Sequence, residues 1–229
     1  MFFDPVYIVI MITTAGLGFW ASWRVKASFK KWSQVASSSG KTGAEIAREI
    51  LRRSGVHDVE VERVGGFLSD HYDPRHKKLR LSPEVYDGNS VAAAGVAAHE
   101  VGHALQHAKR YWPLQVRSYL APAAAFGGNI SMIVFGIGLA VGALGMAKLG
   151  VLLFALMVAF TLITLPVEFD ASSRAKALLP EMGLTAGADG VGVSKVLNAA
   201  AMTYVAGAVS AVATLIYLVI QSGLFGRDD

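Results

Sequence analysis

The stretch VAAAGVAAHEVGHALQHA, residues 91–108, places two histidines four residues apart, with a glutamate directly after the first. On a helix, residues four apart lie on one face, so His99 and His103 can direct their imidazoles toward a common ion. Glu100 lies one residue further round, where it can take a proton from a water on that ion without being a ligand. Neutral imidazoles suit zinc, and the pattern predicts metal-assisted hydrolysis with Glu100 as general base.

The residues around this motif favour a buried metal site over an ordinary helix with three polar side chains. Burying two imidazoles and a carboxylate without partners is costly, and a metal ion satisfies them directly. The neighbours are small or apolar: Ala97, Ala98, Val101, Gly102, Ala104 and Leu105.

A zinc peptidase site needs a third protein ligand and keeps its fourth position for water. His107 continues the spacing, but residues eight apart on a straight helix are separated by about 12 Å along the axis, too far for His99 and His107 to share an ion. A glycine three residues after the second histidine could turn the chain toward a third histidine, but that position is Gln106. We expect His107 to be a helix-end residue or a headgroup contact. Glu168, in LPVEFDASSRAKALLP, is the better candidate for the third ligand.

The composition indicates an integral membrane protein, because hydrophobic residues make up 53% of the chain against 17% charged and gather in long runs. The first run lacks a basic region ahead of it, so we interpret it as an uncleaved anchor and not as a signal peptide. The second and third runs are expected to be joined by a tight glycine-bearing turn. The four predicted spans are about 6–23, 120–144, 149–166 and 199–224.

The distribution of basic residues predicts the topology. Residues 24–118 carry 16 of the 21 lysines and arginines, and residues 167–198 carry three more. With four spans both segments lie on one side, which the positive-inside rule assigns to the cytoplasm. Two membrane crossings then return Glu168 to the side of His103. Positive loops beside anionic headgroups explain the net charge of +4, so no nucleic-acid partner is expected.

The polar segment before the motif predicts a small α+β portion. Residues 39–56 have the periodicity of an amphipathic helix that Gly55 stops, and VEVERVGGFL and KKLRLSPEV predict short strands, with a turn at Asp73–Pro74 between them. The motif helix is expected to start near Asn89 or Ser90 and to end near His107 or Lys109. The predicted fold is a mainly α integral membrane protein with about four transmembrane helices and a small cytoplasmic α+β portion at about 24–118 and 167–198, all in a single domain, 1–229. The order of helix, strands and motif helix resembles the N-terminal half of zinc-peptidase domains, which implies that this portion is zincin-like.

With these residues assembled, the chain resembles the YugP-like family of bacterial membrane zinc metallopeptidases. It is more distantly similar to the heat-shock membrane metalloproteases and the CAAX prenyl proteases. The motifs that carry the likeness extend over nearly the whole chain: FFDP, DHYDP, LRLSPEVY, AAHEVGHALQHA, LPVEFDASSRA and VLNAAAMTYVA.

The resemblance implies a gluzincin-like site with one catalytic zinc, His99, His103 and Glu168 as ligands and Glu100 as general base. In the distant relatives an aspartate four residues after the third ligand orients a histidine ligand, as outer carboxylates do. Here that position is Ser172. We assign the orienting role to Asp170, with a plain polar residue as the alternative.

Two residues are candidates for stabilising the oxyanion of the substrate. They are Tyr204, at the start of the fourth predicted span, and Arg174, six residues after Glu168. The alternatives are an aromatic-belt tyrosine and an arginine that contacts lipid headgroups.

These expectations combine into a zinc-dependent endopeptidase embedded in the bacterial cell (inner) membrane. Its active site is expected on the cytoplasmic side, and its substrates are expected to be peptides or membrane proteins. The alternative is a non-catalytic zinc-binding membrane adaptor. A structural zinc site is closed by four protein ligands, so an intact base beside an open position disfavours it.

Overall fold

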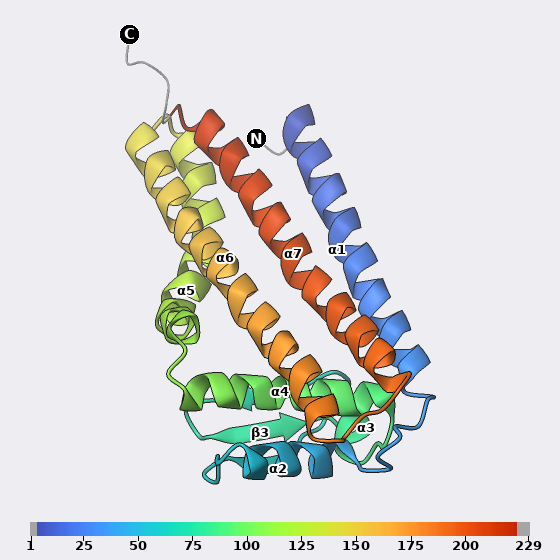
Figure 1. The fold of residues 1–229 in the computed structure, drawn as a ribbon. Helices are drawn as coiled ribbons and strands as arrows, with labels where there is room; N and C mark the ends of the chain where they lie inside the picture. The colour runs from blue at the N-terminus through green and yellow to red at the C-terminus, as the bar shows by residue number, and fades with distance from the viewer. Residues whose placement is uncertain (1–3, 224–229) are drawn as a thin grey trace. The chain divides into compact units, whose positions relative to one another are not determined.

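The computed structural model describes residues 4–223, which are mainly helical (Figure 1). Three short strands and a four-residue helix lie between the second long helix and the motif helix. In chain order the elements are α1 (Pro5–Trp32), α2 (Gly43–Arg53), β1 (Glu60–Arg63), β2 (His71–Asp73), β3 (Lys78–Leu81), α3 (Pro83–Tyr86), α4 (Val91–Ala108), α5 (Trp112–Ala140), α6 (Leu144–Glu181) and α7 (Asp189–Gln221).

Within residues 4–223, four helices, α1, α5, α6 and α7, are long and apolar enough to cross a membrane. A span needs about 20 residues, and α6 alone has 38. Together with the three-stranded sheet, these helices confirm the predicted fold class: a mainly α membrane protein with four transmembrane helices and a small α+β part.

The helices extend beyond the predicted spans, and the turn between the second and third lies elsewhere than expected. It falls at Val141–Ala143, where Gly142 adopts a φ of +70° that favours glycine. The turn was expected between residues 144 and 149, but Gly145 and Gly150, the glycines near that stretch, lie inside α6. That helix also continues through Pro166, where the third predicted span ends. Residue 224, the predicted end of the fourth span, lies outside the described residues.

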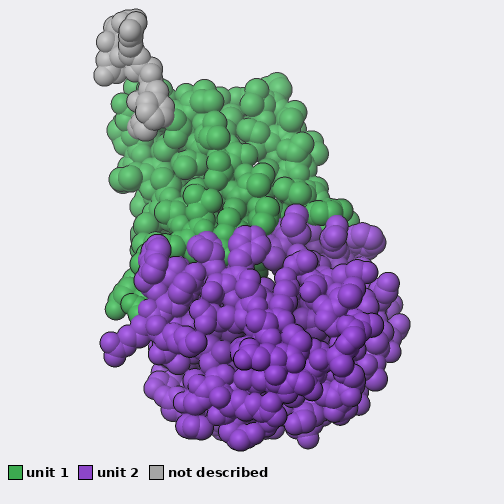
Figure 2. Space-filling model, viewed as in Figure 1, with its two compact units in different colours: residues 1–20, 115–165, 203–229 green, residues 21–114, 166–202 purple. Residues whose placement is uncertain are grey.

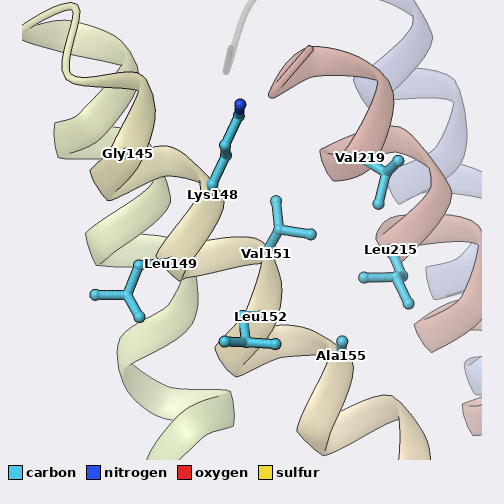
Figure 3. Close-up of a pocket in the computed structure, with 8 residues that line it drawn as sticks. All are labelled: Gly145, Lys148, Leu149, Val151, Leu152, Ala155, Leu215 and Val219. Carbon is cyan, nitrogen blue, oxygen red and sulfur yellow. The ribbon is translucent and has the colours of Figure 1, made fainter. Parts of the chain in front are cut away.

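The chain divides into two compact units (Figure 2). Unit 1 comprises Met1–Trp20, Gln115–Leu165 and Thr203–Asp229, and unit 2 comprises Ala21–Leu114 and Pro166–Met202. Within unit 1, Phe135, Phe154 and Leu218 belong to one apolar cluster. A cavity of about 500 Å³ between α6 and α7 has an apolar lining apart from Lys148 (Figure 3).

Unit 2 contains the predicted amphipathic helix and strands. A capping box between Thr42 and Glu45 starts α2, and Gly55, at φ +72°, follows its end. The sheet order is β1-β3-β2, with β1 parallel and β2 antiparallel to β3. The Asp73 carboxylate accepts the backbone N–H groups of Arg75 and His76, which forms the predicted turn. The sheet order places β2 at an edge of the sheet, and the turn at Asp73 follows β2 directly in sequence.

The motif helix α4 lies at the centre of unit 2, where it contacts α2, α3, β2 and β3. Ser90 is its N-cap and accepts from the backbone N–H of Ala93, which confirms one of the two predicted caps. Its small residues allow close packing. A Cβ on Gly102 would lie 2.7 Å from the carbonyl oxygen of Ala171, so a glycine at 102 lets the backbone of α6 approach α4.

Candidate metal centre

Three side chains from α4 and α6 converge within unit 2. His99 Nε2 lies 3.3 Å and His103 Nε2 lies 3.5 Å from Glu168 Oε2. One potential ligand atom from each of the three lies within 4.8 Å of the others. The Glu168 side chain is 3% exposed and the two histidines are 13% and 10% exposed. The structure thus brings together the three residues that the sequence nominated as ligands, although 65 residues separate His103 from Glu168.

The sequence of α6 places Glu168 on the face that meets α4. The buried residues after Pro166 recur every three or four positions, which is the period of one helix face: Val167, Glu168, Ala171, Ser172, Ala175 and Leu179. The close approach at Gly102 lies on the same face, between His99 and His103 in sequence. A carboxylate on this face of α6 can therefore reach both imidazoles.

The second nitrogen of each imidazole has its own partner. His99 Nδ1 lies 3.1 Å from the Ser172 hydroxyl oxygen, and His103 Nδ1 lies 3.0 Å from the Gln106 amide oxygen. With the ring protons on Nδ1, both Nε2 lone pairs face a carboxylate oxygen that carries only lone pairs. Such a set is repulsive by itself and becomes favourable around a cation. The donor set, two imidazoles and a carboxylate, fits zinc.

The electrostatics of the cluster also favour a positive charge. Burial by itself would lower the pKa of the His103 imidazole. The protonated ring, however, can donate to Glu168 from Nε2, and this hydrogen bond and the charge of Glu100 raise the pKa above its usual value. The surroundings of His103 therefore stabilise a cation, which a bound metal ion can supply in place of a proton.

Glu100, the predicted base, is 8% exposed and directly follows His99 on α4. A second carboxyl group, Asp70, accepts hydrogen bonds from the Ser82 backbone N–H at 2.7 Å and the Ser82 hydroxyl at 3.0 Å. Burial raises the pKa of Asp70 above its usual value, and the charge of Glu100 adds to this effect. The region around Glu100 is thus enclosed and rich in negative charge.

His107 lies outside the metal cluster, at the end of α4. Its Nδ1 lies 2.8 Å from the Tyr72 hydroxyl oxygen, on strand β2. Burial raises the pKa of Tyr72 to about 12, so the phenol keeps its proton at neutral pH. This pair joins the end of α4 to the edge strand of the sheet.

The remaining predicted site residues have different positions. Asp170 Oδ2 accepts from the Gln106 amide at 2.8 Å and from Arg174 Nε at 2.6 Å, so its link to His103 runs through Gln106. Arg174 also lies 5.9 Å from the centre of the Tyr111 ring. Tyr204 belongs to unit 1 and is 37% exposed. The roles of Arg174 and Tyr204 in oxyanion stabilisation stay predictions.

Gln106 and Ser172 contact the two histidines, and sequence reasoning assigned neither of them a role. Gln106 lies three residues after His103, so helical spacing places both on one face of α4. Ser172 likewise lies four residues after Glu168. This spacing could have identified both residues once Glu168 was a candidate ligand.

Comparisons with known proteins agree with this chemistry. The profile of a family described as "Putative neutral zinc metallopeptidase" matches residues 7–223. The chain is 47% identical over 224 residues to a protein of Bacillus subtilis (strain 168) named "Putative membrane protease YugP", a match that covers 98% of this chain and 99% of the relative. No solved structure matches the chain.

Proposed function

The chain belongs to the family of neutral zinc metallopeptidases that its sequence matches, and from this premise we propose that it is a membrane-embedded endopeptidase with one catalytic zinc ion. His99, His103 and Glu168 are the proposed ligands. The observation that carries the proposal is the convergence of their three ligand atoms within 4.8 Å, next to a buried glutamate. Three protein ligands leave a coordination position for water, which is typical of catalytic zinc sites.

In the proposed mechanism Glu100 is the general base. Zinc, when bound, acts as a Lewis acid that polarises a carbonyl group and lowers the pKa of a water molecule. Glu100 takes a proton from the water that attacks the scissile carbonyl and then delivers it to the leaving amine. The position of Glu100 next to His99 in α4 supports this role.

The edge strand β2 is the proposed place for the substrate backbone. An extended peptide can add to a free sheet edge through main-chain hydrogen bonds. β2 has β3 on one side and is joined to α4 through Tyr72 and His107. This arrangement supports peptides, or unfolded segments of membrane proteins, as the substrate class.

The substitution Glu100→Gln tests the mechanism. It keeps the size of the side chain and removes the base, so hydrolysis of casein or a membrane peptide should fall by roughly 10²- to 10⁴-fold. The purified variant should retain one zinc per chain, as measured by metal analysis. Undiminished cleavage would contradict the mechanism. Zinc binding without cleavage in the wild-type protein would favour the alternative, a non-catalytic zinc-binding membrane adaptor.

We also propose that unit 2 faces the cytoplasm of a bacterial cell (inner) membrane. Unit 2 carries 18 of the 21 lysines and arginines, 15 in residues 21–114 and three in residues 166–202, and the positive-inside rule assigns such a segment to the cytoplasm. The chain contains no cysteine, so single cysteines can report the topology. A membrane-impermeant maleimide should label Val141→Cys in intact cells and Glu84→Cys only after permeabilisation. The reverse pattern would contradict this orientation.

A further inference from the structure

Gln106 is a fully buried polar residue in α4, with 0% of its surface exposed. Its amide nitrogen donates to the backbone carbonyl of Val167 at 2.8 Å and to Asp170 Oδ2 at 2.8 Å. Its amide oxygen lies 3.0 Å from His103 Nδ1. The two N–H donors and the oxygen of the Gln106 amide therefore each have a partner.

These partners determine which way the amide points. The Val167 carbonyl can only accept, and Asp170 is a carboxylate that also accepts from Arg174 Nε at 2.6 Å and from Arg174 Nη2 at 3.3 Å. A reversed amide would place its oxygen against two acceptors. The oxygen of Gln106 must therefore face His103, and an amide oxygen only accepts, so the proton of the neutral imidazole lies on Nδ1.

We infer that Gln106 is a positioning residue, which links Asp170 to His103 and holds the His103 proton on Nδ1, so that the Nε2 lone pair points toward Glu168 and the metal. This inference rests on the proposed function, because it assumes that His103 is a ligand. Gln106 acts through His103 and touches neither substrate nor metal. Outer partners of this kind fix the tautomer and the ring orientation of a histidine ligand.

The two histidines differ in how firmly their protons are held. The partner of His99 Nδ1 is the Ser172 hydroxyl, which can donate as well as accept. The partner of His103 is an amide whose orientation is set by two further hydrogen bonds. We therefore expect Gln106 to affect the affinity for zinc even though it does not contact the metal.

The substitution Gln106→Met tests this inference, because methionine has a similar length but no oxygen to accept the Nδ1 proton. Gln221→Met is the control for the same chemical change outside unit 2, since Gln221 also donates to an aspartate, Asp4, at 2.8 Å, but is exposed and lies in unit 1. In a competition titration with a chromophoric chelator, Gln106→Met should bind zinc about 10- to 100-fold more weakly than wild type. Gln221→Met should bind as wild type does.

A second measurement reports the tautomer itself and does not depend on any variant. In metal-free wild-type protein, at a pH where the imidazole is neutral, the ¹⁵N shifts of His103 should be those of the Nδ1–H form. In Gln106→Met the signals should move toward the Nε2–H form. An Nε2–H form in wild type would overturn the inference.

The outcomes separate this inference from the proposed function. If wild type binds no zinc, the proposed function fails. If wild type binds zinc and Gln106→Met binds it equally well, the inference alone fails. If Gln106→Met does not fold, as judged by thermal unfolding, Asp170→Asn is the second variant. It replaces the carboxylate that accepts from the Gln106 amide by a neutral group, so the amide is held less firmly. It should weaken zinc binding in the same direction but by less, and unchanged affinity there would count against the link.

Discussion

The two units bury their apolar side chains in different ways. In unit 2 core residues such as Ile46 and Ile50 are 0% exposed. In unit 1 large apolar side chains such as Phe126 and Leu152 are 63% and 67% exposed, and the apolar windows of the spanning helices are only 6% to 33% buried. An apolar surface of this extent needs lipid around it, whereas unit 2 encloses its own core.

The helix α6 contributes to both units, and its sequence changes at the boundary. Before Pro166 it carries exposed leucines such as Leu149 and Leu162. After Pro166 its buried positions include Glu168 and Ala171. In the spanning part, the composition of the helix determines its environment. In the second part, Glu168 must pack closely against α4, because its carboxylate lies within 4.8 Å of the potential ligand atoms of His99 and His103.

The largest expected effect concerns Glu168, the proposed ligand that α6 contributes to unit 2. Glu168→Gln preserves the size of the side chain but replaces a carboxylate by a neutral amide, which is a poor zinc ligand. We expect zinc to be lost on dialysis and cleavage to fall below detection, while the fold is kept. Metal analysis, peptidase assay and thermal unfolding check this. A variant that retains its zinc would remove Glu168 from the ligand set.

The next effect concerns the approach of α6 to α4. In Gly102→Ala the new Cβ would lie 2.7 Å from the Ala171 carbonyl oxygen, so the helices must separate. We expect a loss of about 1–3 kcal/mol in the free energy of unfolding, with weaker zinc binding.

The control for this substitution lies on the same helix. In Gly95→Ala the nearest atom, of Val193, would be 3.5 Å away, an ordinary contact. Alanine there should stabilise α4 by about 0.5–1 kcal/mol and leave zinc binding unchanged. Equal effects at the two positions would show that the close approach at Gly102 is unimportant.

The third prediction applies the same change to unit 1. In Gly150→Ala the new Cβ would lie 2.6 Å from the backbone nitrogen of Phe135, so α5 and α6 must separate there. We expect a similar destabilisation, about 1–3 kcal/mol, but unchanged zinc affinity per folded molecule. Zinc titration of the folded fraction in detergent checks this. A large loss of affinity would mean that the packing of unit 1 controls the metal site.

The smallest effect is expected on the surface of unit 1. Leu152→Ala shortens a side chain that is 67% exposed on a spanning helix. The free energy of unfolding in detergent should change by no more than about 0.5 kcal/mol. A loss of about 2–5 kcal/mol, as for truncation of a leucine in a protein interior, would show that Leu152 packs against protein and not lipid.

Much of this architecture was predictable from local patterns. Apolar runs identified the four spanning helices, because length and composition alone determine whether a helix suits a bilayer. The buried face of α2, including Ile46 and Ile50, followed from helical periodicity. The spacing of His99 and His103 was likewise sufficient to place both on one face of α4, since that relation depends only on the helical period.

Tertiary structure decided the features that depend on two segments distant in sequence. The continuation of α6 through Pro166 was not predicted, because proline interrupts one backbone hydrogen bond yet is tolerated where neighbouring groups compensate. The role of Asp170 also depended on packing: it contacts Gln106, whose amide in turn reaches His103. Residue types and spacing thus nominated the three candidate ligands by themselves. Which side chains hydrogen-bond the two histidines depended on the packing of α4 against α6. A hydrogen bond requires its two atoms to lie within about 3 Å, and the separation of two residues in sequence does not specify such a distance.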